Sequence, residues 1–238
     1  MKSSTRKPRA SIGEENEKSL HASLKLWYAQ PGDLLEHKIG RYYIDIYRNG
    51  LLIEIQTRNL GALKRKLISL LEEYQIRLVY PIAQDKHIHY YKPGKKKPEK
   101  IRKSPKTGKL MDIFDEIIHL PREILQNPGF SLSVLMIHEE EIRCEDGKGS
   151  WRRKGVSIQD RRFTQVYEEQ RFNQPADYLQ FLPPLLKFPF SNKELADALN
   201  VRIHEAQKIT YAFKQMQLIR LDHKKGNRQY FVIDSKKE

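Results

Sequence analysis

Two short apolar runs joined by an asparagine-glycine pair constrain the fold more than any other feature of the sequence. The runs cover residues 41–47 and 51–57, and Arg48, Asn49 and Gly50 separate them. An Asn-Gly pair between two β-type runs is a strong signal for a tight hairpin, because both residue types tolerate a positive φ. The sequence therefore predicts two antiparallel strands joined by a short turn.

The segments on either side of this hairpin predict helices and further strands. A helix is expected from Glu14 onward, because apolar residues recur there at helical spacing. Residues 60–74 form a second amphipathic pattern, and the apolar, β-branched stretches 76–83 and 87–91 follow it as strands. A hairpin followed by a helix and a buried strand is typical of an α/β domain with a mixed sheet flanked by helices.

The rest of the chain divides into further elements and linkers. Helical spacing returns at 112–120, a strand is expected at 130–138 and a short helix at 163–170, before prolines mark the approach to a last domain. The expected organisation is a disordered basic tail at 1–13, an α/β domain at 14–162 with a basic loop at 92–109, a connecting helix and linker at 163–188, and a smaller domain at 189–238.

Two acidic residues, Asp45 and Glu54, lie within the predicted strands of the hairpin. Acids are depleted in strand interiors, so acids amid aliphatic neighbours require a reason. Because paired strands lie about 4.8 Å apart, Asp45 and Glu54 can bring two carboxylates close enough to share a divalent cation. The alternative is a hairpin with one solvated face, on which Asp45, Glu54 and Gln56 simply contact water.

This arrangement resembles the PD-(D/E)XK nuclease superfamily, whose site places an Asp on one strand and an acid, one intervening residue and a Lys on the next. The matching residues are Asp45 and, after eight residues, Glu54-Ile55-Gln56, within a resemblance that covers residues 14–91. The resemblance implies a restriction-endonuclease-like fold and hydrolysis of phosphodiesters. It also implies that Asp45 and Glu54 bind Mg²⁺, or another divalent cation such as Mn²⁺.

The sequence departs from the family pattern at one position, because Gln56 stands where the family has Lys. A neutral Gln can orient a water molecule through hydrogen bonds, but it carries no charge to stabilise a developing anion. Lys64 or Lys66 on the following helix can replace that cation; the alternative is that both lie on a solvated helix face. Glu17 on the first helix is the candidate accessory acid, with a simple first-turn acid as the alternative.

The carboxy-terminal segment has the pattern of two helices followed by a hairpin. Ser191 and Glu194 form a capping box, and apolar residues then continue at helical spacing through a second helix. Short strands are expected at 218–221 and 229–233, on either side of a basic turn. The pattern resembles winged helix-turn-helix domains and covers residues 189–234.

The winged-helix resemblance implies that the second helix enters the major groove of DNA while the basic turn contacts phosphates. The candidate DNA-binding residues of this domain are Arg202, Lys208, Lys224, Lys225 and Arg228. A role in protein docking or dimerisation is the alternative. Two basic stretches of the larger domain extend the candidate footprint, with solvated loops and a buried tryptophan as the alternative; their residues are Lys96, Lys97, Trp151, Arg152 and Arg153.

Composition restricts the partner. The chain has 44 Lys and Arg against 30 Asp and Glu, and the net charge of +14 attracts polyanions. Without a long apolar span, the sequence predicts a soluble, cytoplasmic protein with no membrane partner. One cysteine excludes a disulfide framework, and His87 and His89, on one strand face, lack an evident third ligand for zinc.

Together these features predict a metal-dependent endonuclease that hydrolyses duplex DNA, with the winged helix delivering the site to its substrate. Cutting both strands calls for a homodimer with one site per strand. The alternative from a different class is a non-catalytic DNA-binding regulator whose nuclease-like domain is inactive. An RNA-processing protein that reads A-form shape is a third possibility.

Overall fold

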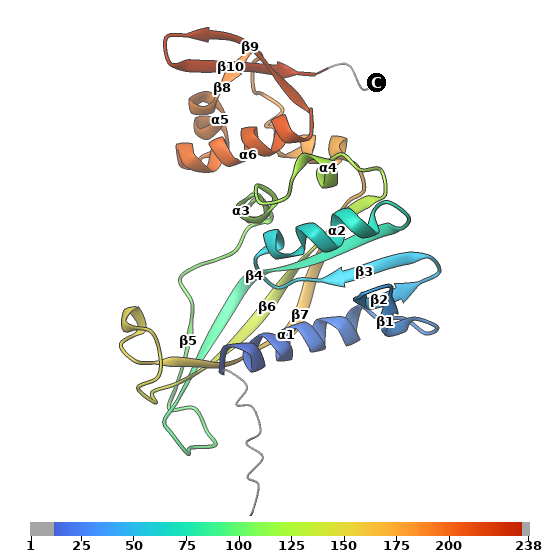
Figure 1. Ribbon diagram of the computed structural model, residues 1–238. Coiled ribbons are helices and arrows are strands. Elements are labelled where there is room, and N and C mark those ends of the chain that lie inside the picture. The colour runs from blue at the N-terminus through green and yellow to red at the C-terminus, as the bar shows by residue number, and fades with distance from the viewer. Residues whose placement is uncertain (1–11, 235–238) are drawn as a thin grey trace, which may run out of the picture. The chain divides into compact units, whose positions relative to one another are not determined.

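The computed structural model describes the backbone of residues 12–234 and the side chains of residues 19–234. Within this part, a seven-stranded mixed sheet has the order β1-β2-β3-β4-β6-β7, with β5 paired to β4 (Figure 1). Its strands are β1 (Leu34–Ile39), β2 (Tyr42–Arg48), β3 (Leu51–Ile55), β4 (Gln75–Tyr91), β5 (Lys100–Lys103), β6 (Phe130–Cys144) and β7 (Ser157–Phe172). The tail predicted at 1–13 lies outside the described residues, except where α1 (Ile12–Tyr28) begins.

The chain divides into two compact units that share the long strands. Of the described residues, the first unit contains 12–29, 83–108 and 136–168, and the second contains 30–82, 109–135 and 169–234. Strands β4, β6 and β7 each contribute residues to both units. The division therefore does not follow the linear boundary expected at 163–188, because strand pairing joins segments that are far apart in the sequence.

The Asn-Gly hairpin is confirmed in the second unit. Asn49 and Gly50 have φ values of 46° and 88°, the two positive angles that a tight hairpin turn requires. The two strands pair antiparallel, with Arg48 opposite Leu51 and Ile46 opposite Ile53. The sequence thus set both the turn and the register of β2 and β3.

Strand β3 runs parallel to β4, with Leu52 opposite Ile76. Parallel neighbours need a crossover connection, which η1 (Leu60–Leu63) and α2 (Lys64–Leu70) provide. Leu67 and Leu70 are the buried residues of α2 and form its inner side. The helix expected at 60–74 therefore exists in shortened form, and the predicted class, an α/β protein with a mixed sheet flanked by helices, is confirmed.

Strand β7 corrects one prediction, because the helix expected at 163–170 is wrong. Phe163, Val166 and Tyr167 are aromatic or β-branched, and such side chains favour a pleated surface over a helix. The segment lies beside β6 in the sheet, and this neighbouring strand provides hydrogen-bond partners for its backbone. Phe163 also packs edge-on against Trp27 of α1, with ring centroids 6.3 Å apart.

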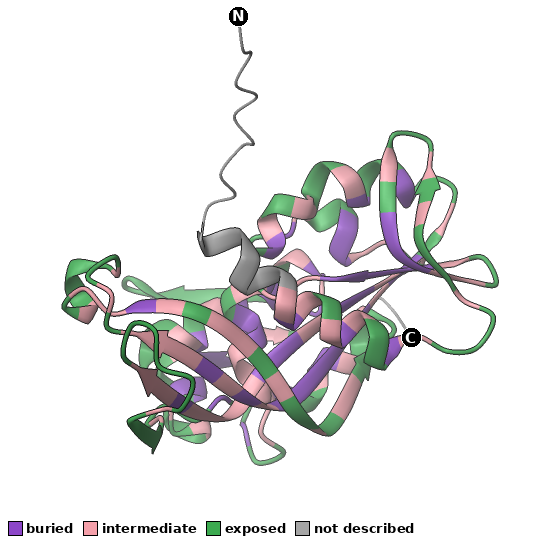
Figure 2. Cartoon of the chain, turned by 90° about the horizontal axis from the view of Figure 1, so that it is seen from below, coloured by how far each residue is buried: buried purple, intermediate pink, exposed green. Residues whose placement is uncertain are grey.

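The strands expected at 76–83 and 87–91 form one continuous strand, β4. The basic loop at 92–109 contains β5, which pairs back on β4 with Ile88 opposite Arg102. Figure 2 shows that the hairpin loops are mostly exposed, whereas buried residues concentrate in the strands. Short helical turns complete the remaining connections: η2 (Leu110–Ile113), α3 (Phe114–Ile117), α4 (Arg122–Leu125), η3 (Trp151–Arg153) and η4 (Pro175–Phe181).

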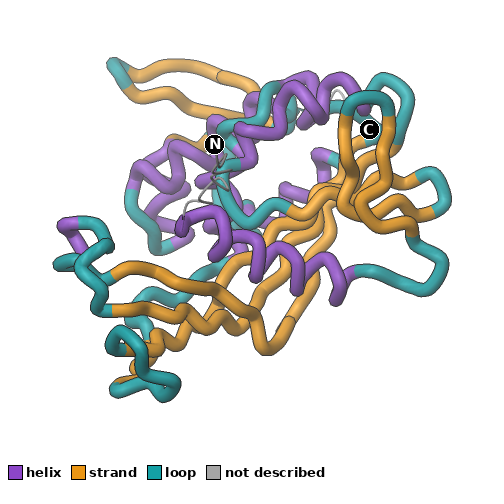
Figure 3. The backbone as a smooth tube through the Cα atoms, turned by 60° about the horizontal axis from the view of Figure 1, so that its bottom comes forward, coloured by secondary structure: helices purple, strands orange, loops and turns teal. Residues whose placement is uncertain are grey.

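The carboxy-terminal segment folds in the order that the sequence predicted. Helices α5 (Asn192–Leu199) and α6 (Ile203–Gln215) precede the hairpin of β9 (Ile219–Lys225) and β10 (Arg228–Ile233), and β8 (Phe190–Ser191) pairs with β10 (Figure 3). The capping box is confirmed, because the backbone N–H of Ser191 donates to the Glu194 carboxylate at 2.7 Å. The apolar residues that recur at helical spacing in α6 and directly after it are fully buried: Ala206, Ile209, Phe213 and Met216.

Helix α6 also packs against α3 of the same unit. The rings of Phe114 and Phe213 lie 5.8 Å apart, and Lys208 Nζ contacts Asp115 Oδ1 at 2.6 Å. This packing ties the carboxy-terminal elements to the second unit. No helix within residues 12–234 is long and apolar enough to cross a membrane.

Candidate functional site

The predicted acids lie where the sheet opens between β2 and β3. The ladder between these strands ends at the pair Ile46–Ile53. Beyond it, the backbone N–H of Ile55 donates to Asp45 Oδ2 at 2.8 Å. The carboxylate thus takes the place of a strand partner for that amide, and Asp45 is fixed against the strand that carries Glu54.

Both acids are buried, so the alternative of a solvated hairpin face is wrong for them. Asp45 and Glu54 are each 8% exposed. Extending the ladder by one residue places them opposite each other on neighbouring strands. Burying a carboxylate is costly unless hydrogen bonds or a countercharge compensate, so this placement requires specific partners.

Lys66 supplies such a countercharge from α2. Its Nζ lies 2.6 Å from Glu54 Oε1 and donates to the backbone carbonyl of Tyr43 at 2.6 Å. The Lys66 side chain is 17% exposed and that of Glu54 is 11% exposed. Of the two lysines considered as substitutes for the missing strand lysine, Lys66 contacts Glu54, whereas Lys64 is exposed on the same helix.

The other two candidate catalytic residues are placed differently. The side chain of Gln56 donates to the backbone carbonyl of Arg58 at 2.6 Å, which directs its amide toward the following loop. The backbone of Glu17 lies in α1, but its side chain falls outside the described residues. Of the sequence candidates, the structure therefore joins Lys66 to Glu54 and fixes Asp45 against the amide of Ile55, the residue after Glu54.

The donor set suits a hard divalent cation. Mg²⁺ is usually held by one or two carboxylates, with water and phosphate oxygens completing its coordination. Asp45 and Glu54 offer two carboxylates, and a nearby ammonium is compatible with a bound phosphate. Among residues 19–234, no group of three or more His, Cys, Asp or Glu side chains is arranged to hold a metal ion.

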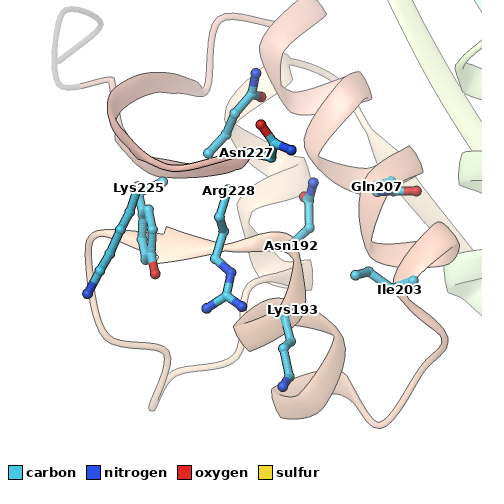
Figure 4. A pocket seen from close by; sticks show the side chains of 9 residues that line it. Asn192, Lys193, Ile203, Gln207, Lys225, Asn227 and Arg228 are labelled. Atoms are coloured by element: carbon cyan, nitrogen blue, oxygen red, sulfur yellow. The ribbon is translucent and has the colours of Figure 1, made fainter.

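A second candidate surface lies in the carboxy-terminal elements. A cavity of about 740 Å³ opens between the starts of α5 and α6 and the hairpin. Figure 4 shows that the long side chains of Lys193, Lys225 and Arg228 extend toward the same side of this cavity. Amide groups of Asn192 and Gln207 also line it, so its described lining combines cations with hydrogen-bonding groups and contains no acid.

The predicted DNA-binding residues of this segment divide into two groups. Lys225 and Arg228 line the cavity, and the neighbouring Lys224 is exposed. Arg202 is exposed at the start of α6, 3.6 Å from Glu205. Lys208, by contrast, pairs with Asp115 and faces α3. Lys193, Asn192 and Gln207 were missed, because only the fold brings the start of α5 to the hairpin.

The basic loops of the first unit are exposed as predicted. Lys96, Lys97 and Arg152 are all exposed. Trp151 is 83% exposed, so the alternative of a buried tryptophan is wrong. Arg153 donates to the backbone carbonyl of Val156 at 3.2 Å and braces its own loop.

The first unit contains a second buried acidic pair that the sequence did not reveal. Glu139 and Glu141 on β6 are 5% and 2% exposed. Lys86 Nζ lies 2.7 Å from Glu139, Arg143 lies 2.5 Å from Glu141, and Arg161 lies 3.5 Å from Glu141. Burial acts to raise the pKa of Glu141, but the cations outweigh it and the pKa is lowered. No local sequence signal marks this network, because its members come from three strands.

The histidines of β4 do not form the zinc site considered from the sequence. His87 Nδ1 lies 2.7 Å from His138 Nε2, and the two rings share a hydrogen bond. His89 instead lies 3.7 Å from Glu140. The two β4 histidines therefore have different neighbours.

The fold and the site define an α/β protein with a mixed sheet and a buried pair of carboxylates where the sheet opens. Residues 18–173 match the family described as Domain of unknown function (DUF8091), and the chain belongs to this family. An uncharacterized protein of Treponema pallidum (strain Nichols) is 32% identical over 174 residues, which cover 73% of this chain and 68% of that protein. No solved structure matches the chain.

Proposed function

We propose that the protein is a metal-dependent nuclease that hydrolyses DNA, with Asp45 and Glu54 as metal ligands and Lys66 as the cation of the site. The observation that carries this proposal is that two buried carboxylates lie on neighbouring strands where the ladder between β2 and β3 ends, and that Lys66 contacts one of them, Glu54. A helix-borne lysine can fill the role for which the sequence offers only Gln56. All three residues lie within the region matched by the family.

The order of the elements supports the proposal. Helix α1, the antiparallel strands β1, β2 and β3, the crossover helix α2 and strand β4, which is parallel to β3, follow one another. Apart from the added strand β1, this is the order of elements on which the resemblance to PD-(D/E)XK nucleases is based. In this order Asp45 lies on β2 and Glu54 on β3, the two strands of the hairpin. The crossover helix α2 then passes close enough to place Lys66 at Glu54.

The chain prepares the site before any substrate arrives. The Ile55 amide fixes the orientation of the Asp45 carboxylate, and Lys66 holds Glu54. A bound Mg²⁺ or Mn²⁺ would supply a Lewis acid and lower the pKa of a bound water. Lys66 would place positive charge where the phosphate gains negative charge, and fixed groups of this kind need no reorganisation during the reaction.

The carboxy-terminal elements support DNA as the partner. Two helices followed by a hairpin are the order of a winged helix, and cations and amides line the cavity between them. Cations bind phosphates, while amide side chains can hydrogen-bond base edges. We assign duplex DNA to this surface, and a homodimer would then provide one site for each strand.

Cleavage of plasmid DNA tests the proposal directly. Wild-type protein with Mg²⁺ or Mn²⁺ should nick or linearise the plasmid, and EDTA or the Asp45→Asn substitution should abolish cleavage. Glu72→Gln, which changes an exposed acid in the turn after α2, is the matched control and should cleave normally. Equal cleavage by Asp45→Asn would overturn the assignment of the site, and cleavage of duplex RNA alone would overturn DNA as the substrate.

One observation favours a second function, a non-catalytic DNA-binding regulator. Gln56 bonds to the Arg58 carbonyl, and the Lys66–Glu54 pair can serve as a structural ion pair of the interior. In that case tight DNA binding would persist without hydrolysis under every divalent metal tested. The same plasmid experiment, paired with a gel-shift measurement of binding, separates the two functions.

A further inference from the structure

The loop between β6 and β7 holds a tryptophan out in solvent. Trp151 is 83% exposed, and the Arg152 guanidinium lies over its ring at 5.6 Å from the ring centroid. The other tryptophan, Trp27, is 48% exposed and packs against Phe163. A large aromatic ring at a loop tip offers an apolar face on which a flat group outside the chain can stack.

The base of this loop, which we call the Trp151 loop (residues 145–156), is fixed by one carboxylate. Asp146 accepts hydrogen bonds from the backbone N–H of Lys148 at 3.0 Å and from the hydroxyl of Ser157 at 2.9 Å. The side-chain amide of Gln159 donates to the same carboxylate at 3.0 Å. The Lys148 backbone hydrogen bond is the main reason that the pKa of Asp146 is lowered.

The tip of the Trp151 loop is also tightly folded. The backbone N–H of Gly149 donates to the Gly155 carbonyl at 2.8 Å, which closes the turn that carries Trp151. A Cβ atom at Gly149 would lie 1.9 Å from the Val156 carbonyl oxygen, so this close approach requires glycine. The tryptophan is therefore presented by a preorganised loop, which reduces the entropy lost on binding.

The charge around the tryptophan indicates the chemistry of its partner. Residues 147–155 contain four Lys or Arg and no acid. The neighbouring loop between β4 and β5 exposes a run of three lysines, 95–97. The backbone N–H of Glu145 donates to the Tyr91 carbonyl at 3.1 Å and joins the bases of the two loops, from which both extend at the same end of the sheet (Figure 1).

We propose that the Trp151 loop is a stacking site for an unpaired base, with lysines 95–97 binding phosphates of the same strand. Aromatic rings combined with cations bind single strands, because every base has a face that can stack and every phosphate is anionic. Bases inside a duplex are already stacked, so an exposed ring selects DNA with unpaired bases. The inference rests on DNA as the partner in the proposed function, and it adds this substrate class.

Tryptophan fluorescence tests the inference without relying on cleavage. The full-length protein carries Asp45→Asn to prevent hydrolysis and Trp27→Phe, so that Trp151 is the remaining tryptophan of the two. Oligo(dT), a blunt duplex of equal length and vesicles of phosphatidylcholine with phosphatidylserine are titrated in parallel. We expect oligo(dT) to quench the Trp151 emission. Anisotropy of fluorescently labelled oligo(dT), which does not depend on tryptophan, should show binding at least about 10-fold tighter than that of a Trp151→Ala variant.

The controls separate stacking from general attraction to a basic protein. Leu185→Ala removes a side chain that is 93% exposed in the second unit, and it should leave the affinity for oligo(dT) unchanged. Trp151→Phe should retain part of the affinity, because a smaller ring can still stack. Circular dichroism verifies the fold of each variant.

Two results would overturn the inference. One is that oligo(dT) leaves the Trp151 emission unchanged and binds Trp151→Ala as tightly as the protein with Trp151. Attraction between phosphates and the basic surface would then account for all of the binding. The other is a response of Trp151 to vesicles but not to oligo(dT), which would identify a membrane surface as the partner. A third result concerns the proposed function alone. If wild-type protein does not cleave plasmid DNA, or if Asp45→Asn cleaves it equally well, while Trp151 still responds to oligo(dT), the proposed nuclease function is overturned and the inference stands.

Discussion

Each compact unit buries a pair of carboxylates, and the two pairs are held in different ways. In the second unit, Asp45 and Glu54 come from neighbouring strands at a point where the ladder ends, and Lys66 reaches Glu54 from a crossover helix. In the first unit, Glu139 and Glu141 lie two residues apart on the same strand, inside the sheet.

The cations around Glu139 and Glu141 come from the sheet itself. Lys86 lies on β4, Arg143 on β6 and Arg161 on β7, so neighbouring strands surround the acids with countercharge. An arrangement of this kind satisfies the buried charges within the fold. The comparison teaches that burial of an acid does not by itself mark a site; the opening of the ladder at Asp45 distinguishes the candidate site.

The largest expected effect tests the structural role of the pair formed by Glu139 and Glu141. Glu141→Ala leaves Lys86, Arg143 and Arg161 facing one carboxylate fewer, and it should lower the free energy of unfolding by about 3 kcal/mol. Urea denaturation followed by circular dichroism measures the change, with the more exposed neighbour in Glu140→Ala as control. A loss of less than about 1 kcal/mol would show that the network contributes little to stability.

The next effect compares the replacement of the lysine in each pair. Lys66→Met should reduce the rate of plasmid cleavage by about 100-fold, because it removes a fixed cation from the site. Lys86→Met, which removes a cation from the other pair, should leave the rate per folded molecule unchanged. Equal rates for wild type and Lys66→Met would assign Lys66 a structural role like that of Lys86.

A pH dependence should distinguish the pairs further. The pKa of Glu141 is lowered in the folded protein, so between the folded and unfolded pKa values the unfolded chain binds more protons. The stabilisation is therefore complete above the ordinary glutamate pKa of about 4.3 and is lost as the pH falls through the lower folded value. Urea midpoints compared for wild type and Glu141→Gln should converge as the pH falls; a constant difference would contradict this assignment.

The smallest effect sharpens the role of α2. Lys64 lies two residues before Lys66 on the same helix and is exposed. Lys64→Met should change the free energy of unfolding by less than about 0.5 kcal/mol and leave cleavage unaltered. A cleavage defect as large as that of Lys66→Met would mean that general positive charge on α2, and not the contact with Glu54, governs activity.

Much of the local structure could be predicted because its signals are short. The Asn49-Gly50 turn and the Ser191 capping box each depend on residues within a few positions of one another. The placement of Asp45 and Glu54 on adjacent strands followed from the hairpin register. The helix expected at 163–170 was wrong because a neighbouring strand, distant in the sequence, decided its conformation.

The sequence by itself determined the hairpin, the acids on its strands, the capped helices and the positive charge, since each depends on backbone preferences or composition. Only the tertiary structure decided that Lys66 reaches Glu54, that Lys208 faces Asp115 and that Trp151 remains in solvent. The physical reason is that countercharge and burial depend on which distant segments pack together, and a linear pattern does not specify those contacts.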